Sequence, residues 1–219
     1  MDRLGKVHTL FFDFDGTIHN SIKIYAPAFR KAYEFLVEKG FAEKRIWTDD
    51  EISHWLGFTS KSMWKEFMPN LDKTYQKKAS SMIGDIEKNL MDNKEAVLYE
   101  GSLETLEYLK NKGYRLVFLS NCSNSYRDQA YKIFGLDRYF DDLISAEDYN
   151  FIPKHEILKK IKDKYPKERA MVGDRIHDME AAKLNNVKSI GCSYGFGSYE
   201  EIKDADVIID DIRKLQEIL

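Results

Sequence analysis

The sequence predicts an α/β fold with a doubly wound parallel sheet, and two patterns along the 219 residues support this class. Short, near-continuous apolar runs recur through the chain, as is typical of strands that are buried on both faces of a parallel sheet. Segments with helical spacing lie between several of these runs, and this alternation is typical of a parallel sheet covered by helices. A third pattern, a long stretch after the first run without a convincing strand, predicts a second, smaller, all-helical domain.

The expected strands are residues 7–12, 115–119, 169–172, 187–192 and 206–209, with a weaker candidate at 142–145. The expected helices between them are residues 102–111, 125–134, 155–164 and 179–185. For the first of these helices, Ser102 is the expected N-cap, and Gly113 follows the C-terminus.

The stretch between the first and second strands predicts four helices, at residues 22–37, 51–56, 61–68 and 73–91. In the first of them, Ile22, Tyr25 and Phe29 recur at helical spacing. A crossover between parallel strands needs only about a dozen residues, so this stretch is long enough for a domain of its own. We therefore expect a helical domain at residues 19–93, inserted into a catalytic core of residues 1–18 and 94–219.

Composition and charge exclude several classes of protein. Hydrophobic residues at 43% and charged residues at 32% are ordinary for a globular protein, and the net charge is −3. No basic stripe, spanning apolar run or signal-peptide pattern is present, so we expect neither nucleic acid nor a membrane as partner. Cys122 and Cys192 form no disulfide framework or zinc spacing, and we expect a reduced, cytoplasmic protein.

Chemically active residues follow the predicted strands, where ligands bind in an open α/β sheet. The first strand is followed by Asp13, Asp15, Gly16 and Thr17, the second by Ser120 and Asn121, and the fourth by Asp174 and Asp178; Lys154 opens the helix before the fourth strand. Oxygen ligands in this number suit Mg²⁺, and a lysine with small hydrogen-bonding groups beside it suits a phosphoryl group. Helix capping is the alternative role for Asp174 and Asp178.

These residues form four motifs, in order: DFDGT at 13–17, Ser120 in LSN, Lys154, and GDRIHD at 173–178. With them, the whole chain resembles the haloacid dehalogenase superfamily of aspartate-nucleophile phosphatases, and in particular its phosphoglycolate phosphatase-like members. The helical insertion resembles the cap domain of that family. The resemblance implies a Mg²⁺-dependent phosphatase that acts on small phosphorylated metabolites.

The resemblance also implies the catalytic roles. Asp13 would attack phosphorus and form an aspartyl-phosphate, and Asp15 would protonate the leaving oxygen and then deprotonate the attacking water. Two adjacent acids with opposite protonation states would explain the paired aspartates of DFDGT. Mg²⁺ would bind the Asp13 carboxylate, the Asp15 backbone carbonyl and Asp174, with Asp178 acting directly or through water.

The phosphoryl oxygens would be bound by Ser120, Asn121, Lys154 and the backbone around Gly16 and Thr17. In the helical domain, the loop at residues 56–61 is expected to face the active site and to select the substrate through Lys61; a solvated lysine at a helix start, capped by Ser60, is the alternative. His19 lies near the expected hinge and is a second candidate for substrate specificity. The GFGS segment at 195–198 lacks the last glycine of a dinucleotide-binding fingerprint and is expected to be a loop over the site.

Other functions remain open at this stage. A phosphomutase of the β-phosphoglucomutase type would use the same core and cap, and a non-catalytic binding protein would keep the fold alone. A dehalogenase is disfavoured because Asp15 and the GDRIHD acids suit phosphoryl transfer. The motif set favours a phosphatase, but neither the substrate nor the oligomeric state follows from it.

Overall fold

The computed structural model describes residues 4–219 and contains one six-stranded parallel sheet with the strand order β3-β2-β1-β4-β5-β6. Every strand pair is parallel, so all carboxyl ends lie at one edge. The doubly wound fold predicted from the sequence is confirmed, including the weak strand. The strands are β1 (Thr9–Phe12), β2 (Arg115–Ser120), β3 (Asp142–Ser145), β4 (Arg169–Gly173), β5 (Lys188–Cys192) and β6 (Val207–Ile209).

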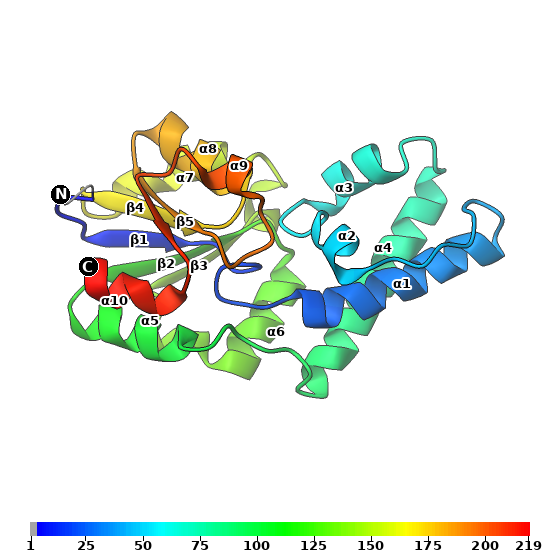
Figure 1. Ribbon diagram of the computed structural model, residues 1–219, viewed down its shortest axis with the longest axis horizontal. Helices are drawn as coiled ribbons and strands as arrows, with labels where there is room; N and C mark the ends of the chain where they lie inside the picture. The colour runs from blue at the N-terminus through cyan, green and yellow to red at the C-terminus, as the bar shows by residue number, and fades with distance from the viewer. Residues whose placement is uncertain (1–3) are drawn as a thin grey trace.

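Helices cover both faces of the sheet (Figure 1). One face packs against α5 (Ser102–Asn111), α6 (Asn124–Phe134) and α10 (Leu215–Ile218), and the other against α7 (Lys154–Ile161) and α8 (Ile176–Asn185). A short α9 (Tyr199–Ile202) lies next to α8. Single 3₁₀ turns complete the connections at Leu136–Arg138, Glu147–Tyr149, Lys162–Lys164 and Ile212–Lys214.

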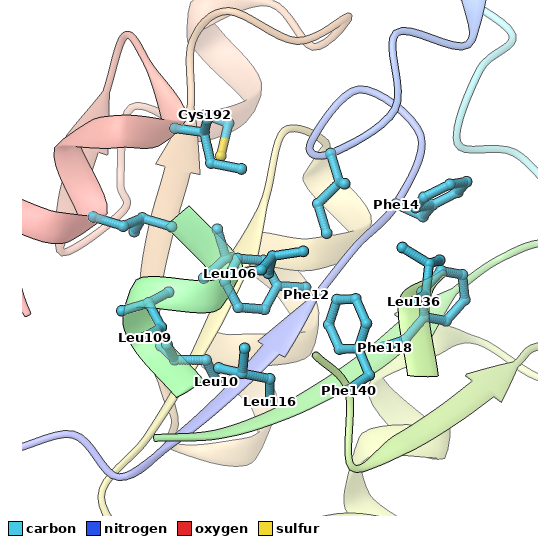
Figure 2. Close-up of a cluster of buried hydrophobic side chains, with 14 of the residues drawn as sticks. Leu10, Phe12, Phe14, Leu106, Leu109, Leu116, Phe118, Leu136, Phe140 and Cys192 are labelled. Atoms are coloured by element: carbon cyan, nitrogen blue, oxygen red, sulfur yellow. The ribbon is translucent and has the colours of Figure 1, made fainter. Parts of the chain in front are cut away.

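Side chains of alternate residues in the central strands pack on opposite faces of the sheet. On β1, Leu10 and Phe12 join one apolar cluster and Phe11 joins the other, and all three are fully buried. This alternation is why the central strands read as continuous apolar runs rather than as half-polar ones. Figure 2 shows the larger cluster, where Phe12 and Phe118 lie beside Phe140 and Leu136.

Four further helices form a separate unit beyond the carboxyl ends of the strands (Figure 1). They are α1 (Ile22–Glu38), α2 (Asp49–Ser53), α3 (Ser60–Phe67) and α4 (Lys73–Asp92). They have apolar clusters of their own, in which Ala28, Leu36, Trp64 and Ile83 are among the buried residues. The sequence analysis placed all four helices within a few residues of these bounds. The domain boundaries at residues 18 and 94 remain a prediction.

Helix starts are the main corrections to the sequence analysis. The N-cap of α5 is Gly101 with φ +79°, not Ser102, whose hydroxyl donates to Ile18 O at 3.3 Å. The helix predicted at 179–185 begins earlier, at Ile176, because the GDRIHD loop already turns into the helix. The N-cap of α3 is Thr59 rather than Ser60, since its side chain accepts a hydrogen bond from Ser62 N.

Among residues 4–219, no helix is both long enough and apolar enough to cross a bilayer.

The aromatic cluster under β1 and β2 should dominate the stability of the core. Phe118 is fully buried, with its ring centroid 5.2 Å from that of Phe14 and 5.9 Å from that of Phe140. We expect Phe118→Ala to lower the free energy of unfolding by about 3–5 kcal/mol, because it removes buried area and leaves a cavity. Urea unfolding measures the change. Leu184→Ala, at an exposed position of α8, is the control and should cost less than about 0.5 kcal/mol. Equal losses of unfolding free energy in the two variants would contradict this account.

Candidate active site

The predicted site residues gather at the carboxyl edge of the sheet. Asp13 directly follows β1, Ser120 ends β2, and Asp174 directly follows β4. Because β1 is paired in parallel with both β2 and β4, the three side chains emerge side by side. None of the three residues is more than 2% exposed, so this edge holds a buried polar cluster.

Lys154 joins two carboxylates of this cluster. It is the first residue of α7, and its Nζ lies 2.9 Å from Asp13 Oδ1 and 2.6 Å from Asp178 Oδ1. All three side chains are at most 3% exposed. Charges buried to this extent are tolerated only when they are paired, so the ammonium group is a structural requirement of the acidic cluster.

Three of the carboxylates are close enough to hold one cation. Asp13, Asp174 and Asp178 each offer an oxygen, and these oxygens lie within 4.8 Å of one another. Lys154 supplies one positive charge against three acidic groups, which leaves the cluster short of positive charge. A set of three hard oxygen donors at this spacing fits a divalent cation.

Burial and mutual repulsion raise the pKa values of Asp13 and Asp174. Burial, followed by the charge of Asp178, raises the pKa of Asp13 well above its usual range, although Lys154 opposes the shift. The same two causes raise the pKa of Asp174 to about 7. Burial lowers the pKa of Lys154, but Asp13 and Asp178 outweigh it and raise that pKa above its ordinary value. A bound cation would favour the ionised form of both acids.

The Asp174 carboxylate is held in place by two loops. Thr17 Oγ1 donates to its Oδ1 at 3.3 Å, and the N–H groups of Phe196 and Gly197 donate to its Oδ2 at 2.7 and 3.3 Å. Gly16 approaches from the first loop with φ +81°, and a Cβ there would lie 2.2 Å from Asp174 Oδ2, so only glycine fits. The GFGS segment is thus a loop over the site, as predicted.

Asp178 caps a helix and lies in the carboxylate cluster, while its role as a metal ligand remains a prediction. It is the third residue of α8, and its Oδ2 accepts from the backbone N–H of Arg175 at 3.0 Å, as a capping residue does. Its Oδ1 is bound to Lys154 and belongs to the carboxylate cluster. One side chain therefore starts the helix and completes the acidic site.

The loop after β1 closes on itself. Gly16 N donates to His19 O at 2.9 Å and Thr17 N donates to Phe14 O at 3.2 Å. The backbone N–H groups of Gly16 and Thr17, expected to face a phosphoryl group, are therefore engaged within this turn. Their role in phosphate binding remains a prediction, whereas the Thr17 side chain has a defined place on Asp174.

Asp15 lies apart from the other acids, against an aromatic wall. Tyr126 OH donates to Asp15 Oδ1 at 2.7 Å, and His19 Nδ1 lies 3.3 Å from the same oxygen and 3.0 Å from Tyr126 OH. The sequence analysis expected Asp13 and Asp15 to lie close together and to hold opposite protonation states. The acids that raise the pKa of Asp13 are Asp178 and Asp174.

A cavity of about 290 Å³ opens between the sheet edge and the helical unit. Asp13, Asp15, Ser120 and Asn121 line it from the sheet side. Asn121 also reaches across, because its Nδ2 donates to Gly57 O at 3.0 Å. The volume is that of a small-molecule site.

The two residues predicted to select the substrate do not line this cavity. Lys61 lies exposed on α3, and His19 is fully buried behind Asp15, with its ring stacked on Phe14 at a centroid distance of 5.0 Å. His19 touches the site through Asp15 and Tyr126. The specificity role of both residues remains a prediction, without support from their positions.

Three residues of the site had not been singled out from the sequence. Glu87 on α4 and Tyr126 on α6 both line the cavity. Arg175 donates to the carbonyl groups of His54 and Leu56 in the helical unit. Arg175 stands inside the GDRIHD motif, so its position was a signal, whereas nothing in the local sequence distinguishes Glu87 from its acidic neighbours.

The sequence matches known proteins over most of its length. A family model described as haloacid dehalogenase-like hydrolase matches residues 10–192. A phosphoglycolate phosphatase from Colwellia psychrerythraea is 27% identical over 91% of this chain and 90% of that protein. Pyrophosphatase PpaX from Bacillus mycoides is 25% identical over 98% of this chain and 97% of that protein.

Solved structures share the fold. A predicted phosphoglycolate phosphatase from Haemophilus somnus has a TM-score of 0.79 at 22% identity, covering 97% of both chains. CbbY from Rhodobacter sphaeroides, in complex with phosphate, has a TM-score of 0.76 at 18% identity, covering 96% of both chains. The family match spans most of the chain and includes all four motifs, and the chain therefore belongs to the haloacid dehalogenase-like hydrolases.

Proposed function

We propose that this chain is a Mg²⁺-dependent phosphatase that hydrolyses small phosphate monoesters through an aspartyl-phosphate on Asp13. The observation that carries the proposal is the buried Asp13 carboxylate, which lines the cavity and is held by Lys154 at 2.9 Å. The phosphatase and pyrophosphatase names of the two relatives support phosphoryl transfer as the reaction class.

In the first half-reaction, an Asp13 oxygen attacks phosphorus and forms a new O–P bond. The bond between phosphorus and the ester oxygen breaks, and Asp15 gives its proton to that leaving oxygen. Tyr126 positions Asp15 by donating to Oδ1, which leaves the other carboxylate oxygen to face the reaction. Lys154 and Ser120 stabilise the charge on the phosphoryl oxygens.

In the second half-reaction, water attacks the phosphoryl group on Asp13. Asp15, now ionised, takes a proton from this water, and the bond between Asp13 and phosphorus breaks to release phosphate. The proton that left Asp15 in the first step is thereby restored. The same two carboxylates serve both steps, so the enzyme returns to its starting state.

The acidic cluster would hold the metal. Asp13, Asp174 and Asp178 supply the carboxylate oxygens, and the loop hydrogen bonds of Thr17, Phe196 and Gly197 fix Asp174. When bound, Mg²⁺ supplies positive charge that holds Asp13 ionised and offsets the charge of the phosphoryl oxygens.

The helical unit would act as a cap over the cavity. Its residues Trp55, Gly57 and Ser80 line the wall opposite Asp13. The guanidinium of Arg175 donates to His54 O at 3.3 Å and to Leu56 O, and its Nε lies 2.9 Å from Glu201. Cap closure over the cavity would exclude water before attack, and opening would release the product.

The phosphomutase alternative makes a different prediction for the intermediate. A mutase would pass the phosphoryl group from Asp13 back to a sugar phosphate and would need a bisphosphate activator. Phosphate release without such an activator would favour the phosphatase.

Substitution of the nucleophile tests the proposal directly. We expect Asp13→Asn to lower phosphate release from p-nitrophenyl phosphate by at least about 10³-fold, because the amide is a poor nucleophile. Asp137→Asn, the same change at an exposed position, is the control and should retain full activity. Full turnover in Asp13→Asn, with unfolding unchanged, would exclude Asp13 as the nucleophile.

Metal binding can be measured without turnover. At a Mg²⁺ concentration 100 times its dissociation constant, the folded protein should gain about 2.7 kcal/mol, which appears as a rise in Tm. Chelator should reverse the rise and abolish phosphate release. Asp174→Asn removes one ligand charge and should lose most of the Tm rise. A full rise in that variant would place the metal elsewhere.

The contact between Arg175 and the helical unit gives a third test. Arg175→Ala removes charged hydrogen bonds to residues 54 and 56, each with a net value of about 1.5–3 kcal/mol. We expect amide hydrogen exchange in residues 54–58 to become at least about tenfold faster, since 1.4 kcal/mol is a factor of ten. Arg213→Ala is the control because this arginine is exposed and pairs with Asp211. Unchanged exchange would show that Arg175 does not hold the loop.

A further inference from the structure

Glu87 places a third carboxylate in the cavity, on the side of the helical unit. It lies on α4 on the same helical face as Ser80, Ile83 and Gly84, which also line the cavity. No hydrogen bond or ion pair joins the Glu87 side chain to any other residue between 4 and 219. Burial, with a contribution from the charge of Asp15, raises the pKa of Glu87 to about 8. The carboxyl group is only partly buried and lines the cavity, so a ligand in the cavity can reach it.

Positive charge is missing from this part of the molecule. Among the described residues that line the cavity, there are three acids, Asp13, Asp15 and Glu87, and there is no lysine, arginine or histidine. Two cationic groups at the acidic edge are already paired, Lys154 with Asp13 and Asp178, and Arg175 with Glu201. A carboxylate or a second phosphate on the substrate would meet only like charge away from the phosphoryl group.

The rest of the wall suits a small polar leaving group. Tyr25, Trp55 and Tyr126 line the cavity beside Glu87, and burial followed by nearby acids, Glu87 among them, raises the pKa of Tyr25 and that of Tyr126. Aromatic rings attract ammonium groups, and a carboxylate beside them can accept a hydrogen bond from an ammonium or a hydroxyl group. The Trp55 indole N–H is buried and has no hydrogen-bond partner among residues 4–219.

We propose that Glu87 determines specificity by accepting a hydrogen bond from the leaving group of the substrate. This inference rests on the proposed phosphatase function. The favoured substrates are monoesters whose leaving group carries a hydroxyl or ammonium donor, and the disfavoured ones carry a carboxylate or a second phosphate there. Glycolate has a carboxylate at this position, so phosphoglycolate is a poor substrate of this chain.

Three esters of nearly equal length separate these cases. They are 2-hydroxyethyl phosphate with a hydroxyl donor, phosphoethanolamine with an ammonium donor, and phosphoglycolate with a carboxylate; p-nitrophenyl phosphate reports on the chemistry alone. For the wild-type enzyme with Mg²⁺ at pH 9, where Glu87 is ionised, we expect kcat/KM for phosphoglycolate to be at least about tenfold below that of the better donor ester. The ranking of the two donor esters shows whether Glu87 prefers a hydroxyl or an ammonium donor.

At pH 9, above its pKa of about 8, Glu87 is ionised, and Glu87→Gln then removes the charge but keeps an acceptor oxygen. We expect kcat/KM to fall about tenfold for phosphoethanolamine, to fall less than about threefold for 2-hydroxyethyl phosphate, and to rise about five- to tenfold for phosphoglycolate. Activity on p-nitrophenyl phosphate should stay within about twofold. Asp85→Asn, the same loss of charge at an exposed position of α4 outside the cavity lining, should leave the ranking unchanged.

The outcomes are distinguishable. Preference for phosphoglycolate in the wild-type enzyme, or a ranking that is identical in Glu87→Gln, overturns the role of Glu87 while release from p-nitrophenyl phosphate upholds the phosphatase. The wild-type ranking stands as a test even if Glu87→Gln does not fold. No release from any of the four esters overturns the phosphatase and the inference together.

Discussion

The bonds of Lys154 to Asp13 and Asp178 are the interaction on which the site depends. Three acids are buried at the edge of a parallel sheet, where water screens little of their repulsion. The ammonium group offsets one of these charges from inside the protein. Without it, the loop after β1 and the start of α8 would be driven apart, because each carries one of its two partners.

The acidic cluster still carries excess negative charge, and hydrogen-bond donors from the surrounding loops are directed at it. Thr17, Phe196 and Gly197 turn hydrogen-bond donors toward Asp174, and Arg175 N–H does the same for Asp178. These donors come from loops that are far apart in sequence and meet only because the strands are parallel. The sheet thus has a functional purpose beyond its core, since its register sets which loops share the acidic edge.

Much of the fold and the heart of the site were predictable from the sequence. Most of the strands read as apolar runs, and residues 142–145 were the weaker candidate. The paired aspartates, Lys154 and the GDRIHD acids all fall at strand or helix ends, where position determines which groups meet. Helix starts were less predictable, because Gly101 and Arg175 act through backbone geometry rather than through a typical capping side chain. The wall of the cavity was not predictable: Lys61 has the expected charge but lies outside, while Glu87 faces inward from an ordinary polar helix. Such positions depend on how the helical unit packs against the carboxyl edge of the sheet, and no local sequence pattern encodes this packing.

Arg175 belongs to both halves of the molecule at once. Its backbone N–H holds Asp178 in the acidic cluster, while its guanidinium holds the carbonyl groups of residues 54 and 56 above the cavity. The two sets of contacts are made by one residue, at the start of α8. Any displacement of the loop at residues 54–56 relative to the acidic edge has to stretch or break the contacts of this one residue. Arg175 is thus a single residue that joins the loop above the cavity to the acid that starts α8.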